Sequence, residues 1–103
     1  MRVTPEQLHL IKTLAHRYFG DDAELWLFGS RADDSKRGGD YDFLIETSLN
    51  DAETIVTRKI DLIAELQNTV PFEDEKIDIV VKRRFFSFDM PIYAIAKQEG
   101  VRL

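Results

Sequence analysis

The chain has 103 residues, 44% hydrophobic and 11% aromatic, which is enough for one domain with a buried core and too few for two. Fourteen Lys and Arg against nineteen Asp and Glu give a net charge of −5, which argues against gripping a nucleic-acid backbone by charge alone. The absence of cysteine excludes disulfides, thiolate metal sites and cysteine nucleophiles, and two histidines are too few for zinc without carboxylate help. No apolar stretch approaches the roughly 18 residues of a membrane span, and no signal-peptide layout is present, so we expect a cytoplasmic protein.

The first part of the chain predicts a helix, a buried strand and a loop. Residues 4–7, TPEQ, form a capping-box pattern, and apolar residues then recur at spacings of three and four up to Gly20. Residues 24–28 are short, apolar and aromatic, as in a buried strand. The small, polar and charged run 29–39 predicts a loop, with a helical turn after Ser30.

Two further strands are predicted over residues 40–46 and 76–82, with a helix between them. We expect Asn50 to cap this helix, which runs to about Gln67. Its apolar stripe, expected to face the core, consists of Ala52, Ile55, Val56, Ile60, Leu62, Ile63 and Leu66.

The last part of the chain predicts a short helix from Pro91 to Lys97, closed by Gly100, and a terminal strand over 101–103. An aromatic cluster precedes this helix, and we expect it to seal the core beneath the helix, with a partner interface as the alternative. The cluster consists of Phe85, Phe86, Phe88 and Met90.

Three aspartates, Asp40, Asp42 and Asp78, stand among the apolar residues of these strands, where aspartate is depleted. The first two lie roughly 6.6 Å apart along one strand, and neighbouring strands are about 4.8 Å apart, so Asp78 completes a cluster if its strand adjoins theirs. Clustered carboxylates repel one another unless a cation lies between them, and oxygen ligands favour Mg²⁺ or Mn²⁺. The cluster predicts a divalent-metal site.

Each aspartate also has a structural interpretation. Asp40 follows Gly39 and fits a turn, Asp78 fits a solvated position on an edge strand, and Asp42 would need a buried cationic partner. The metal interpretation rests on the three together.

The pair Gly29-Ser30 follows the first strand directly. A small-residue turn of this kind exposes backbone N–H groups and a hydroxyl, which suits a phosphate, although it is also a common tight bend. The loop that begins with this pair ends at the carboxylates. Arg31, Lys36 and Arg37 add positive charge, and we expect two of these three to do no more than keep the loop solvated.

The chain resembles the minimal nucleotidyltransferases of the DNA polymerase β-like superfamily in three features taken together. These are the run from Gly29 to Ala32, the run from Gly39 to Asp42, and Asp78 in a later strand. Nine residues separate Ser30 from Asp40, close to the loop of about ten residues in that pattern, although many members carry Ser where this chain has Gly39. The resemblance implies an α/β (α+β) single domain over 1–103, with a mixed β-sheet flanked by helices.

By the same resemblance, the protein would use Mg²⁺ (or Mn²⁺) and a nucleoside triphosphate, usually ATP. Asp40, Asp42 and Asp78 would be the catalytic metal ligands, with Asp78 also activating the acceptor hydroxyl. Gly29 and Ser30, with Arg31, would hold the triphosphate.

Stand-alone domains of this size resemble the antitoxin half of toxin-antitoxin modules whose partner is a helical HEPN-type toxin. The resemblance implies transfer of AMP to a tyrosine hydroxyl of that toxin, in a homo- or hetero-oligomer. The alternative is a non-catalytic antitoxin that neutralises its partner by docking. Extension of a nucleic acid is disfavoured by the net charge of −5.

Overall fold

The computed structural model describes residues 1–103 and contains three α-helices, two short 3₁₀ turns and four strands. In chain order these are α1 (Pro5–Phe19), β1 (Glu24–Phe28), η1 (Gly29–Ala32), β2 (Tyr41–Thr47), α2 (Ala52–Gln67), η2 (Val70–Phe72), β3 (Ile77–Arg83), α3 (Pro91–Glu99) and β4 (Val101–Arg102).

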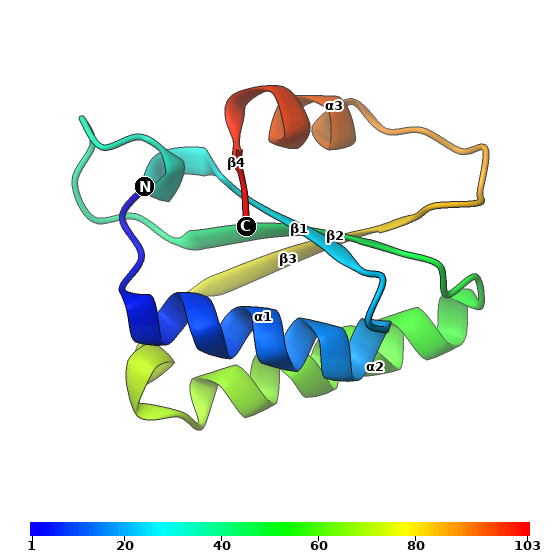
Figure 1. Ribbon diagram of the computed structural model, residues 1–103, viewed down its shortest axis with the longest axis horizontal. Helices are drawn as coiled ribbons and strands as arrows, with labels where there is room; N and C mark the ends of the chain where they lie inside the picture. Colours follow the sequence, from blue (N-terminus) through cyan, green and yellow to red (C-terminus); the bar gives the residue numbers. More distant parts are fainter.

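The four strands form one mixed sheet in the order β3-β2-β1-β4. β1 runs antiparallel to both of its neighbours, and β2 and β3 are parallel, so α2 is the crossover between them. Helices α1 and α2 cover one face of the sheet and α3 covers the other (Figure 1). The predicted α+β architecture, a mixed sheet flanked by helices, is confirmed.

Alternation along the strands gives the sheet two different faces. Phe43 and Ile45 of β2 belong to the larger core under α1 and α2, whereas Leu44 packs with Trp26 and Ala96 in a smaller core under α3. Asp42 is two residues from Leu44 and therefore points to the same face, the one that α3 covers.

The start of α1 follows the predicted capping box, since Thr4 Oγ1 accepts from the Gln7 amide and Gln7 Oε1 accepts from the Thr4 amide. The predicted cap of α2 is wrong by one residue. Asp51 caps this helix by accepting from the Thr54 amide at 2.9 Å, since its carboxylate can reach that donor.

The predicted core stripe of α2 is also wrong in part. Ile55, Leu62 and Leu66 are buried and Ile63 is partly buried, but Ala52 is exposed, and Val56 and Ile60 are 56% and 61% exposed. The helix carries apolar residues on more than one face, and the angle at which it crosses the sheet decides which of them are covered.

The aromatic cluster after β3 does not seal the core. Phe85 and Phe88 are 75% and 60% exposed, and Phe86 and Met90 are exposed as well. The segment bridges β3 to α3 beyond the end of the sheet, where no element lies over it (Figure 1). No helix of the structure has the length and apolarity needed to cross a membrane.

Candidate functional site

The candidate site lies at the end of the sheet where β1 ends and β2 and β3 begin. Asp42 stands opposite Phe28 of β1 and beside Asp78 of β3 in the strand register. Residues paired in register point to the same face, so both carboxylates lie on the α3 face of the sheet. The two strands are neighbours, so the condition on which the expected carboxylate cluster depended is met.

Two glycines let the loop approach these carboxylates. Gly29 has a φ of +71°, and a Cβ atom at this position would collide with Asp42 Oδ2. Gly39 has a φ of +90°, and a Cβ atom there would collide with Ser30 Oγ. The two ends of the loop thus lie against each other, with Gly29 and Ser30 directly beside the start of β2.

The electrostatics of Asp42 show that the three carboxylates influence one another. Burial raises the pKa of Asp42 above its ordinary value of 3.8, the charges of Asp78 and then Asp40 raise it further, and Lys76 opposes them. Asp42 is half-buried while Asp78 is exposed to solvent. The site therefore holds closely spaced negative charge on a partly desolvated surface.

Asp40 lies one residue before β2, not inside the strand as expected. Its carboxylate pairs with Lys76 Nζ at 3.5 Å, an exposed contact that contributes little stability. As the side chains stand, no three acidic or histidine residues form a metal cage. The donor set nevertheless fits a divalent ion, because three carboxylates that repel one another are the oxygen ligands that Mg²⁺ or Mn²⁺ prefers.

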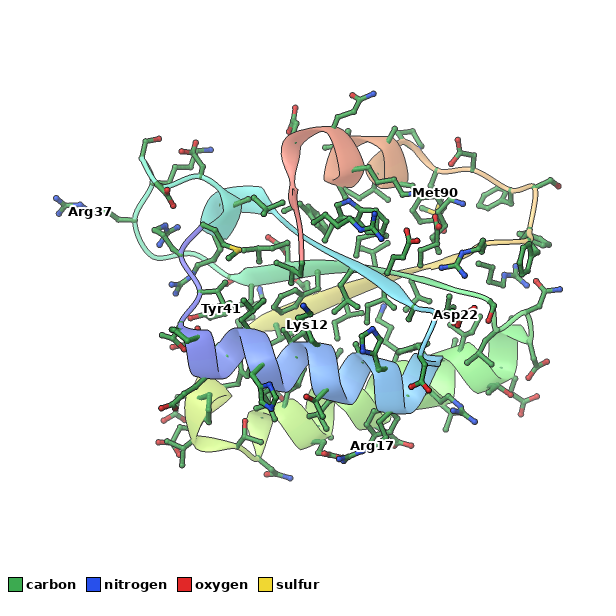
Figure 2. All side chains as sticks on the ribbon, viewed as in Figure 1. Lys12, Arg17, Asp22, Arg37, Tyr41 and Met90 are labelled. Atoms are coloured by element: carbon green, nitrogen blue, oxygen red, sulfur yellow. The ribbon has the colours of Figure 1, made fainter.

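Arg31 lies apart from the carboxylates. Its guanidinium is 4.2 Å from the centre of the Tyr41 ring, and Tyr41 belongs to the core under α1 and α2. Figure 2 shows Tyr41 directed from β2 toward α1. Arg31 Nε donates to the carbonyl oxygen of Gly39 at 3.2 Å. The structure therefore brings together Gly29, Ser30 and the aspartates but directs Arg31 toward the other face.

A pocket of about 330 Å³ opens beside the Gly29-Ser30 turn. Lys36 is the only cationic residue in its wall, and the wall also includes Glu99 at the end of α3. The predicted phosphate-binding turn thus lines a pocket, as a binding role requires. The lining residues are Gly29, Ser30, Ala32, Asp33, Lys36 and Glu99.

Sequence reasoning missed a charged cluster at the other end of the same sheet face. The Glu46 carboxylate accepts from Lys97 Nζ of α3 at 2.6 Å and lies 3.5 Å from Lys82 Nζ and 3.4 Å from Arg84 Nε. Burial alone would raise the pKa of Glu46, but these cations, Lys97 foremost, outweigh burial and lower it. The available signal was a glutamate two residues beyond Leu44 and four beyond Asp42, and so on the same strand face.

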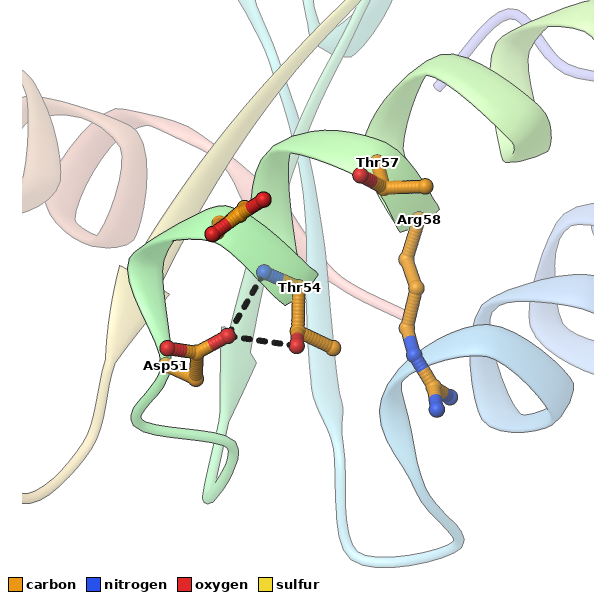
Figure 3. A pocket seen from close by; sticks show the side chains of 5 residues that line it. Asp51, Thr54, Thr57 and Arg58 are labelled. Carbon is orange, nitrogen blue, oxygen red and sulfur yellow. Dashed lines mark hydrogen bonds between the residues drawn. The ribbon is translucent and has the colours of Figure 1, made fainter.

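A second depression lies at the start of α2 (Figure 3), and this helix covers the face of the sheet opposite α3 (Figure 1). The Asp51 carboxylate there accepts from both the amide and the hydroxyl of Thr54. Arg58 in its wall donates to the Tyr18 carbonyl at 2.9 Å. These contacts cap and brace the helix, and none of the predicted site residues lies there.

The sheet order, the glycine turn and the row of aspartates form the arrangement of a nucleotide-transferring domain. The family model described as nucleotidyltransferase domain matches residues 9–100, which include every predicted site residue. The chain therefore belongs to the nucleotidyltransferase domain family, and its general chemistry is nucleotidyl transfer. A comparison with curated proteins found no match.

Proposed function

We propose that the protein transfers AMP from ATP to a hydroxyl group of a partner protein, with Asp40, Asp42 and Asp78 as its catalytic carboxylates. The observation that carries this proposal is the register of the sheet, which sets Asp42 beside Asp78 on one face, next to the Gly29-Ser30 turn. Carboxylates beside a phosphate-binding turn are the parts that nucleotidyl transfer needs.

In this reaction the acceptor oxygen forms a bond to the α-phosphorus of ATP, and the bond from that phosphorus to the bridging oxygen breaks. Pyrophosphate leaves, and the hydroxyl proton passes to a base. Asp78 is the candidate base, because it is exposed on the strand next to Asp42 and so open to an incoming acceptor. Gly29 and Ser30 would orient the triphosphate through their backbone N–H groups and the Ser30 hydroxyl.

The three aspartates would also hold a divalent cation, Mg²⁺ or Mn²⁺, whose charge would stabilise the attacking and leaving oxygens. Asp42 is the central ligand in this proposal, since it lies between Asp78 across the strands and Asp40 along the chain. Asp40 would exchange its ion pair with Lys76 for the cation.

The acceptor we propose is a tyrosine hydroxyl of a helical HEPN-type toxin, which makes this protein the antitoxin of the pair. Two features support a protein acceptor over a nucleic acid. The net charge is −5, which suits docking onto a basic, RNA-binding partner and opposes docking onto RNA itself. The exposed aromatic cluster offers apolar surface for a protein interface.

The direct test is the intact mass of the protein encoded by the adjacent reading frame after incubation with this protein, ATP and Mg²⁺. We expect a gain of one or more AMP groups on a tyrosine. Asp78→Asn should slow the transfer at least tenfold while retaining more of its ATP binding than of its activity.

Two other outcomes would contradict the proposal in different ways. A partner that is bound and inhibited at unchanged mass would identify a docking antitoxin without turnover. A transfer rate for Asp78→Asn equal to that of the wild type would remove this aspartate from the role of base.

A further inference from the structure

The loop from Gly29 to Gly39 carries three basic side chains, and a fourth, Arg2, lies against it from the start of the chain. The structure gives these four cations different surroundings. The guanidiniums of Arg2 and Arg31 donate hydrogen bonds to the backbone of the loop, whereas Lys36 and Arg37 make no side-chain hydrogen bond or ion pair. Of these last two, only Lys36 lines the pocket beside Ser30. The four are Arg2, Arg31, Lys36 and Arg37.

Arg2 binds the loop from outside the pocket wall. Its Nη2 donates to the carbonyl oxygen of Ser30 at 2.8 Å and to that of Gly38 at 2.7 Å, which joins the two ends of the loop. Its Nε lies 3.4 Å from the Asp33 carbonyl, and its own amide donates to the Arg31 carbonyl at 2.8 Å. Hydrogen bonds from a guanidinium to several carbonyls are charge-assisted and directional, so Arg2 restricts the shape of the loop.

Arg31 completes this arrangement from the opposite side. Its Nε donates to Gly39, the last glycine of the loop, and its Nη1 lies 3.4 Å from the Arg2 carbonyl oxygen. Together the two guanidiniums satisfy the carbonyl oxygens of four loop residues, whose partial negative charge would otherwise act on any anion bound nearby. The four are Ser30, Asp33, Gly38 and Gly39.

Lys36 differs from both arginines. Its backbone amide donates to the Asp33 carbonyl at 3.2 Å, which fixes the turn that carries it, while its ammonium group forms no hydrogen bond or ion pair. The Asp33 carboxylate accepts from the amide and the hydroxyl of Ser35, and these hydrogen bonds foremost, with a smaller contribution from the charge of Lys36, lower its pKa. Arg37, the next residue, points outward into solvent from the tip of the loop (Figure 2).

We propose that Lys36 is the cation that binds the phosphates in this pocket, and that Arg2 is the positioning residue that holds the loop in the required shape. The inference rests on the proposed function, in which Gly29 and Ser30 bind the triphosphate, and it names a further contact there. It transfers the role expected of Arg31 to Lys36, because the guanidinium of Arg31 is committed to the Gly39 carbonyl and the Tyr41 ring.

The test measures ATP binding by calorimetry in the presence of Mg²⁺ for the full chain and for two matched variants. Lys36→Gln and Arg37→Gln remove the same charge from neighbouring positions of one loop. We expect Lys36→Gln to weaken ATP binding by about three- to tenfold, since a solvent-exposed charge contact to phosphate is moderate in strength. Arg37→Gln should change it by less than about twofold, and AMP binding should suffer less from Lys36→Gln than ATP binding does.

Arg2 is tested by a double-mutant cycle. Arg2→Met should weaken ATP binding, Arg2→Lys should restore it only in part, and Lys36→Gln should cost less in the Arg2→Met background than in the wild type. That coupling is the readout, because a merely structural arginine would lower the melting temperature without changing the effect of Lys36. Each variant is measured well below its own melting temperature.

Equal effects of Lys36→Gln and Arg37→Gln would overturn the assignment of Lys36 alone. Strict additivity of the Arg2 and Lys36 substitutions would overturn the positioning role of Arg2. A wild-type protein that binds neither ATP nor AMP would overturn the proposed function, and this inference with it.

Discussion

Among single residues of the candidate site, Gly29 is the one whose substitution would act directly on an aspartate. It combines a positive φ with a Cβ direction that runs into the Asp42 carboxylate. Any side chain here adds backbone strain and also displaces an aspartate that we assign to the metal. The two effects can be separated because Gly38 also has a positive φ but has no atom near its Cβ direction.

Gly29→Ala and Gly38→Ala should therefore differ in function more than in stability. Gly38 has a φ of +61° with nothing within 4 Å of its Cβ direction, so its substitution adds only the left-handed strain, about 1–2 kcal/mol. Gly29→Ala should lose the same amount of stability and also most of the stabilisation by Mg²⁺ and ATP. Thermal melting with and without the two ligands measures the loss of stability and the loss of the ligand response. Equal loss of the ligand response in the two variants would contradict the placement of Gly29 against Asp42.

The charge of Asp42 gives a second prediction at this scale. An acid whose pKa is raised in the folded state destabilises the fold at neutral pH, where it must be ionised. Asp42→Asn should therefore melt higher than the wild type in a chelator, by about 2–4 °C, which corresponds to on the order of 0.5 kcal/mol after screening by solvent.

With Mg²⁺ and ATP the order of the two melting temperatures should reverse. A ligand at a hundredfold excess over its Kd stabilises the wild type by about 2.7 kcal/mol, and Asp42→Asn should lose most of this gain. If Asp42→Asn melts lower in chelator and still responds fully to Mg²⁺ and ATP, Asp42 is a structural residue and not a metal ligand.

At the scale of elements, the position of α3 matters most, since its last residue, Glu99, lines the pocket beside Ser30. This helix is short, and it is attached to the sheet by the small core around Trp26 and by the ion pair of Lys97 with Glu46. Glu46 is largely buried, so removal of its charge would leave the cations packed around it without their counter-charge.

Glu46→Gln should lower the free energy of unfolding by about 1–3 kcal/mol at neutral pH, because three cations lose their shared carboxylate. Glu24→Gln is the matched control. Glu24 stands opposite Glu46 in the sheet and pairs with the exposed Arg102, so its loss should cost less than about 0.5 kcal/mol.

The pH dependence of this pair of variants follows from the lowered pKa of Glu46. A carboxylate with a lowered pKa stabilises the fold fully above its ordinary value, here 4.5, and loses that contribution as the pH falls through the lowered value. The stability gap between the wild type and Glu46→Gln should therefore narrow as the pH falls below about 5. A gap that stays constant down to pH 3 would show that the ion pairs do not cause it.

For the whole molecule, the aromatic side chains divide into a buried group that stabilises the fold and an exposed group at the surface. Phe72 of η2 is fully buried, packs at 5.3 Å edge-on to Tyr41 and lies 6.4 Å from the ring centre of Phe43. Phe85 and Phe88 are exposed in the segment between β3 and α3.

Phe72→Ala should cost about 3–5 kcal/mol, whereas Phe85→Ala and Phe88→Ala should each stay within about 0.5 kcal/mol of the wild type in chemical denaturation. If the exposed cluster contacts the proposed protein partner, the two surface variants should weaken partner binding without loss of stability. A large loss of stability in Phe88→Ala would restore the interpretation that the cluster seals the core.

The sequence by itself determined the features that depend on local chemistry. The capping box of Thr4, the Gly29-Ser30 turn and the alternation of Asp42 with apolar neighbours are each readable within a few residues, and the family pattern joins them at fixed spacing. These signals were enough to predict the order of the elements and, through the family resemblance, a mixed sheet. The contact that brings Asp42 beside Asp78 was only a condition at that stage, and the register of the sheet supplies it.

Only the tertiary structure decided which apolar side chains are buried and which cations of the loop line the pocket. Val56, Ile60 and Phe85 are as apolar as their buried neighbours, and their exposure depends on how helices and loops cross the sheet. Likewise Arg31 and Lys36 are both cations of one loop, and the family resemblance assigned the triphosphate to Arg31. One is committed to the Gly39 carbonyl and the Tyr41 ring while the other lines the pocket, because long-range contacts with Arg2 and β2 set the shape of their loop.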